Sequence, residues 1–132
     1  MKSLLALLAT LFFFISTVHA DVKTEVTELQ TNWAKANYNV EKKAQQQAFE
    51  TLIQQANNVV ESNPDAVELL IWRGIINSTF AGVKGGLGAM KYAKASKADL
   101  EKAISIDGKA LSGSGYMSLG ILYYKVPGWP IG

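Results

Sequence analysis

Few side chains in this sequence could catalyse a reaction or bind a metal ion. The 132 residues include no cysteine and one histidine, His19, which lies in an apolar N-terminal segment. Without a thiolate or a second imidazole, the rest of the chain lacks the usual zinc ligands and the usual acid–base groups. Asp99 and Glu101 are two residues apart, so they would point in different directions from a helix. We therefore expect no enzyme; a serine hydrolase, the weakest alternative, would need lysine as its base.

The glycine-rich segment from Gly82 to Gly88 suggests an anion site around Lys84. Consecutive backbone N–H groups in such a loop can bind a phosphate. However, the segment has no Gly-Lys-Ser/Thr ending, lacks the third glycine of a dinucleotide fingerprint and follows no predicted strand. We interpret it as a hinge between helices and keep Lys84 as the residue that would contact an anion. No motif implies a cofactor.

The first twenty residues have the features of a secretory signal peptide. Lys2 provides the positive start, Leu4 to Ile15 form an apolar run, and Val18-His19-Ala20 precede a cleavage position before Asp21. The run is too short to span a bilayer, and an N-terminal anchor that is never cut is the alternative interpretation. We predict a periplasmic protein without a stable membrane span after cleavage, in which residues 21–132 form a single domain without disulfides.

Charge is unevenly distributed over the expected mature chain. Residues 21–72 contain four lysines and eight acids, whereas residues 73–132 contain eight basic and three acidic residues. The basic second half could attract an acidic partner or a membrane surface; the alternative is that these charges are ordinary solvated helix faces. Because the overall charge is near neutral, we expect no binding to nucleic acid.

Apolar residues recur at helical spacing and predict about five helices. A stripe from Val22 to Val40 indicates a first helix that ends near Asn37–Asn39, and a second runs from Ala44 to about Ser62. Asn63-Pro64-Asp65 is typical of a helix start, with Asn63 as the N-terminal cap. The helix that follows, to about Phe80, is apolar on nearly all sides, so we expect it to be central.

Two further helices are expected in the second half. A stripe from Met90 to Ile104 closes at Asp107-Gly108, where glycine suits the left-handed cap position. Ser112-Gly113-Ser114-Gly115 is interpreted as a flexible link into the last helix, which Pro127-Gly128 ends. Because the links are short, we expect an all-α chain of antiparallel helix pairs.

Leu119-Gly120-Ile121-Leu122-Tyr123-Tyr124-Lys125 resembles the first helix of a tetratricopeptide-repeat (TPR) unit, in which the glycine lets the paired helix approach closely. Leu100 to Asp107 resembles the end of a second helix, and Gly74 repeats the pattern upstream. The register is imperfect, since Arg73 stands where leucine is usual and the Gly82–Gly88 segment lengthens the unit. The resemblance implies a TPR-like αα superhelix.

A narrower resemblance covers roughly Asp65 to the end of the chain. Ile71-Trp72-Arg73-Gly74-Ile75, the glycine-rich segment and the terminal Val126-Pro127-Gly128-Trp129-Pro130-Ile131-Gly132 are similar to a family of exported, uncharacterised proteobacterial TPR-like proteins. That family implies a further helix after Gly132. The last helix would then lack its antiparallel mate and expose an apolar face, as expected of a C-terminally truncated form, of marginal stability or of self-association.

TPR units bind through the concave surface of their first helices, so the resemblance implies a non-catalytic periplasmic interaction or scaffold module for a peptide or protein of the cell envelope. The alternative is an accessory component of periplasmic solute uptake, similar to the TPR-built partner of tripartite transporters, which holds a small apolar or anionic ligand near Lys84 and Trp129. Core packing is the competing explanation for the apolar positions, and a plug over the core is the competing explanation for Trp129. The positions carried over as partner-binding are Ile71, Ile75, Ser78, Met117, Ile121 and Tyr124, with Trp129 as an exposed aromatic side chain.

Overall fold

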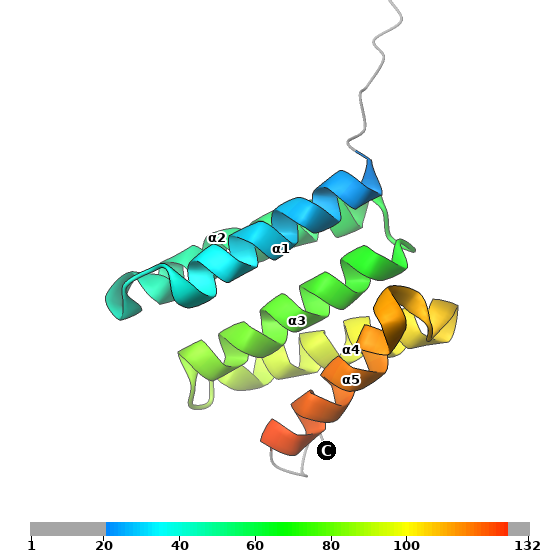
Figure 1. Cartoon of the computed structure of the whole chain (residues 1–132). Coiled ribbons are helices and arrows are strands. Elements are labelled where there is room, and N and C mark those ends of the chain that lie inside the picture. Colours follow the sequence, from blue (N-terminus) through cyan, green and yellow to red (C-terminus); the bar gives the residue numbers. More distant parts are fainter. Residues whose placement is uncertain (1–20, 127–132) are drawn as a thin grey trace, which may run out of the picture.

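The computed structural model describes residues 21–126, which form five helices (Figure 1). The expected signal peptide, residues 1–20, and the expected helix stop at Pro127-Gly128 lie outside the described residues. The helices are α1 (Val22–Tyr38), α2 (Lys42–Ser62), α3 (Val67–Lys84), α4 (Ala89–Asp107) and α5 (Ala110–Lys125).

The helices pack mostly against their neighbours in the chain. Figure 1 shows α1 and α2 side by side, with α3 and α4 beneath them and α5 against the lower pair. In the described part, α3 is the helix that contacts all four others. This arrangement confirms the all-α prediction and the central position expected for the helix whose apolar residues cover most of its circumference.

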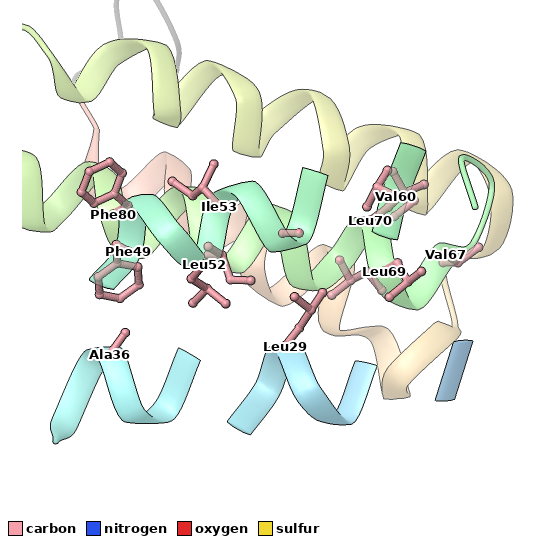
Figure 2. Packing of buried hydrophobic residues seen from close by; sticks show 14 residues of the cluster. Leu29, Ala36, Phe49, Leu52, Ile53, Val60, Val67, Leu69, Leu70 and Phe80 are labelled. Carbon is pink, nitrogen blue, oxygen red and sulfur yellow. The ribbon is translucent and has the colours of Figure 1, made fainter. Parts of the chain in front are cut away.

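The main hydrophobic core lies where α3 meets α1 and α2 (Figure 2). Leu29 of α1 and Phe49 of α2 are fully buried there, and the ring of Phe49 stacks on that of Phe80 from α3 at a centroid distance of 5.9 Å. A second, smaller cluster of Ala81, Ala93 and Leu122 joins α3, α4 and α5. Residues of α3 belong to both apolar clusters. Burial of such side chains is the main favourable contribution to folding, so α3 holds the two parts of the fold together.

The prediction that Asn63 caps the third helix is wrong. Asn63 closes α2 instead: its backbone N–H donates to the carbonyl oxygens of Val59 and Val60, and its side-chain amide also donates to the Val59 oxygen. Pro64 follows in a turn in which the Ala66 N–H donates to the Asn63 oxygen, and α3 begins only at Val67. Proline favours the second position of such a turn as much as the first helical position, so the local signal was compatible with both.

The prediction of a left-handed cap at Gly108 is also wrong. Gly108 closes α4 with a right-handed φ of −67°, and the left-handed residues come later, at Leu111, Ser112 and Gly113. They make a kink inside α5 in place of the expected flexible link. A different constraint acts at Gly108, because a Cβ there would lie 2.7 Å from Cε2 of Tyr116.

Polar contacts tie α3 to α4. The buried Ser96 hydroxyl donates to the carbonyl oxygen of Gly74 at 2.7 Å. Arg73 forms a bidentate pair with Asp99, in which Nε and one terminal nitrogen each donate at 2.7 Å to a carboxylate oxygen. The charged side chain at the position where the TPR pattern has leucine is therefore paired, as a largely buried charge must be.

Candidate functional site

A cavity of about 610 Å³ lies between α1, α3, α4 and α5. Its lining includes residues from the last turns of α1, α3 and α5 and from the first turn of α4. Lys125 lines the cavity and is exposed to solvent, so this side chain marks its mouth. Its walls are mainly apolar. The lining residues are Trp33, Asn37, Tyr38, Ile75, Ser78, Thr79, Ala81, Gly82, Gly86, Ala89, Met90, Ala93, Ser118, Ile121, Leu122, Lys125 and Val126.

The α1 side of the cavity is held in place by Trp33. Its indole N–H donates to the Thr79 hydroxyl oxygen at 3.0 Å, and that hydroxyl donates to the carbonyl oxygen of Ile75. The Trp33 ring also makes edge contacts with Trp72 and Tyr38, each at a centroid distance of 5.8 Å. Because the indole is bonded and packed on two sides, this aromatic wall is preorganised.

The polar groups of the cavity are fewer and mostly unpaired. Ser118 is 9% exposed, and the described part of the chain offers its hydroxyl no hydrogen-bond partner. Ser118 lines the cavity, and no unpaired polar side-chain atom of the described residues is sealed from solvent. We infer that solvent reaches this hydroxyl through the cavity. The half-buried Ser78 lines the cavity and also has no side-chain partner among the described residues. Such hydroxyls remain available to a bound molecule.

Lys125 supplies the charge of the cavity. Among the described lining residues, Lys125 is the only Lys, Arg, His, Asp or Glu. The other lining residue with a titratable group is Tyr38. Lys125 lies in the last turn of α5, and the described residues provide it with no acidic partner. Lys125 is therefore the one cationic side chain of the cavity, and none of the described lining residues is acidic.

The six positions carried over from the TPR resemblance do not form one surface. Ile75, Ser78 and Ile121 line the cavity. Ile71 is 1% exposed and belongs to the main core. The other two, Met117 and Tyr124, lie on the outer side of α5, and Trp129 lies outside the described residues.

The outer face of α5 is rich in exposed apolar side chains. Tyr124 is 91% exposed, Met117 63% and Ile121 46%, and Tyr116 is exposed beside them. Met117, Ile121 and Tyr124 follow each other at steps of four and three residues, so they line one face of the helix. We call these three residues the α5 stripe. In the part of the chain that the structure describes, no helix packs against this partly apolar face.

Lys84 is not among the residues that line the cavity. Its Nζ lies over the ring of Phe80 at 5.8 Å from the centroid, and its chain packs against Gly88. The turn beside it is shorter than predicted, because α3 continues through Gly82 to Lys84. The N–H groups of Gly85, Ala89 and Met90 already donate to backbone oxygens. These geometries give no support to an anion site at the glycine-rich segment.

Sequence reasoning missed Trp33, Ser118 and Lys125 as site residues. Trp33 lies within the stripe from Val22 to Val40, which predicts a helix, and the structure places it in α1. The spacing of that stripe does not indicate that α1 contacts the other helix pair. The one available signal was the position of Lys125 at the end of an otherwise apolar segment. Facing residues of distant helices meet only through tertiary packing.

The described residues include no group of three or more histidines, cysteines or acids placed to hold a metal ion. Nor does any described helix combine the length and apolar character needed to cross a membrane. Comparisons of the chain with models of known protein families, with curated proteins and with solved structures give no match.

Proposed function

We propose that this protein is a non-catalytic, TPR-like interaction module of the periplasm, which binds a protein partner along the α5 stripe. The observation that carries the proposal is the concentration of exposed apolar side chains on one helix that has no helix packed on its outer side in the described part. Large exposed apolar patches on a folded domain are most often interaction sites.

The geometry of α5 favours an apolar helix of the partner as the docking element. Its exposed residues are spaced as in helix-in-groove recognition, where anchors recur every three or four positions. Gly120, in the middle of the stripe, has open space around the position of a Cβ. A glycine there allows a second helix to approach the backbone closely.

Other features support a TPR-like arrangement. In α3, Gly74 lies so close to α4 that a Cβ would be 2.8 Å from the Leu100 side chain, which is the close approach that the TPR glycine provides. Sequential helices also pack as antiparallel neighbours, as repeat proteins do. The periplasmic location is inferred from the N-terminal segment.

Site-specific photocrosslinking in intact cells tests this function. A photoreactive phenylalanine analogue replaces Tyr124 or Met117, and the matched control places it at Leu87, which is 97% exposed on the turn before α4. We expect one discrete adduct with an envelope protein from both α5 positions and none from Leu87. The same adducts from all three positions, or none from α5, would contradict the proposal; an adduct of two copies of this chain would replace the foreign partner by self-association.

Binding of a small ligand, as in an accessory component of solute uptake, is a second candidate. The observation that favours it is the cavity, whose volume is within the usual range for small-molecule sites. The residues that line the cavity support contacts of such a ligand with Lys125 and the α1 aromatic wall, whereas Lys84 is not among the lining residues.

A further inference from the structure

We propose that the cavity binds one small monocarboxylic acid with an apolar body, and that Lys125 receives the carboxylate at the mouth. This inference takes the second candidate function and names its ligand class. It does not depend on the α5 stripe as a protein-docking surface, because Lys125, Ser118 and Ser78, which carry it, are not members of that stripe. Ile121 is the one stripe residue that also lines the cavity.

The walls set the apolar body of the ligand. Trp33 stands on one side of the cavity, Ile75 and Met90 on others, and Leu122 belongs to the buried cluster at its base. A volume of about 610 Å³ leaves room for an alkyl chain or a fused aromatic ring system. Filling such a space removes apolar surface of both ligand and wall from water, which is the main source of affinity for small molecules in sites of this kind.

The charge of the cavity selects the head group. Lys125 carries the one full charge at the mouth, and the described residues do not neutralise it. Three helix C-termini, which carry partial negative charge, also end near this mouth. Their effect is reduced because the carbonyl oxygens of Ala36, Ala81 and Leu122 already accept hydrogen bonds. The first turn of α4, where a helix carries partial positive charge, lines the cavity as well. Together with Lys125 it opposes the reduced negative charge of the C-termini, so an anion is favoured over a cation.

The hydroxyls supply orientation. Ser118 and Ser78 come from α5 and α3 and border the same cavity without side-chain partners in the described part. Ser118 is the more telling of the two, because a side chain that is nine-tenths buried ordinarily finds a partner for its polar atom. A carboxylate oxygen accepts hydrogen bonds from such hydroxyls and from a lysine ammonium group.

Head-group specificity is measured by calorimetric titration of the whole chain, as purified, with decanoate, decanol and decyltrimethylammonium. The three share one alkyl chain, so their apolar contribution is matched. We expect decanoate to bind with one site per chain and about tenfold more tightly than decanol, the usual effect of a charge-assisted hydrogen bond that is partly exposed. Decyltrimethylammonium should bind most weakly. A parallel titration with 2-naphthoate identifies whether a lipid chain or a compact aromatic acid is the better source of the carboxylate.

Two variants locate the site. Lys125→Met removes the charge and keeps the length of the side chain, and it should make decanoate and decanol bind equally. Lys94→Met, an exposed position on α4 that does not line the cavity, is the matched control and should leave the tenfold preference unchanged. Ser78→Trp fills the cavity and should weaken both ligands at least tenfold, with circular dichroism showing that the helices are retained.

Equal binding of decanoate and decanol to the unaltered protein would overturn the inference, as would full decanoate preference in Lys125→Met. Unchanged binding in a folded Ser78→Trp variant would show that the ligands attach elsewhere, including the α5 stripe. Absence of saturable binding by decanoate and 2-naphthoate would mean that another segment of this chain, a second copy or a protein partner fills the cavity. A failure of the photocrosslinking experiment leaves these titrations unaffected, so the two proposals can fail separately.

Discussion

Two glycines of α3 should respond to the same substitution with opposite signs. Both Gly74 and Gly82 lie within the helix with right-handed backbone geometry, so alanine is the better helix former at each. At Gly82 an added Cβ would meet nothing within 4 Å. At Gly74 it would meet Cγ and Cδ2 of Leu100, each at 2.8 Å, in the contact between α3 and α4.

The expected magnitudes follow from these distances. Replacing glycine by alanine in a helix stabilises it by up to about 1 kcal/mol, so Gly82→Ala should raise the free energy of unfolding by roughly 0.5–1 kcal/mol. At Gly74 the same gain is opposed by overpacking, which costs about 1–3 kcal/mol. Leu100 is fully buried and has little room to move. We therefore expect Gly74→Ala to lose about 1 kcal/mol, which for a domain of this size lowers the melting temperature by roughly 5 °C.

Urea denaturation followed by circular dichroism measures both variants. The cause is isolated by the Leu100→Ala background, in which the crowding atoms are absent and Gly74→Ala should become stabilising. Leu100→Ala itself will cost about 2–5 kcal/mol, so the comparison of Gly74→Ala with Gly82→Ala remains the primary test. If both substitutions stabilise the unaltered protein equally, the close approach of α3 and α4 at Gly74 is refuted.

Three further substitutions probe other contacts. Asp99→Asn should lower the free energy of unfolding by about 2–3 kcal/mol. This is somewhat less than for a fully buried pair, because the Arg73 side chain is 24% exposed. A loss under about 0.5 kcal/mol in urea denaturation would show that the pair is not formed. Thr79→Val removes the hydrogen-bond acceptor of the Trp33 indole and should lower the free energy of unfolding by about 1 kcal/mol. It should also shift the NMR resonance of the indole N–H, and an unchanged resonance would contradict that hydrogen bond. In the α5 kink, Ser112→Gly should stabilise the protein and Gly113→Ala should destabilise it, each by about 1 kcal/mol or less, because both residues have positive φ. Melting temperatures of the two variants that change in the same direction would argue against the left-handed turn.

Much of the secondary structure could be predicted from the sequence. The stripe that starts at Val22 and the stripe that ends near Ser62 correspond to α1 and α2, since each depends on the spacing of residues within one helix. The apolar circumference of the segment that became α3 also identified it as central, because a helix can be apolar all round only if other helices cover it.

Turns were predicted less well, because the same residues suit several local geometries. Asn63 is a good cap for a following helix, yet its amide turned back to α2. Glycine at position 108 suggests a left-handed cap, whereas in the structure it is right-handed and the ring of Tyr116 lies against it. At Asn63 a hydrogen bond to the preceding helix competes with capping of the next one, and at Gly108 the glycine adopts an ordinary right-handed conformation.

The candidate site was beyond the sequence, because its members are distant in the chain. Trp33, Ser78 and Lys125 line one cavity because both α1 and α5 pack against α3. Local composition also does not distinguish two serines on helices. The Ser96 hydroxyl donates to the backbone of α3, whereas Ser118 lines the cavity and its hydroxyl has no partner among the described residues. Periodicity reports which side of a helix is apolar, but only packing decides whether that side fills a core, lines a cavity or stays exposed.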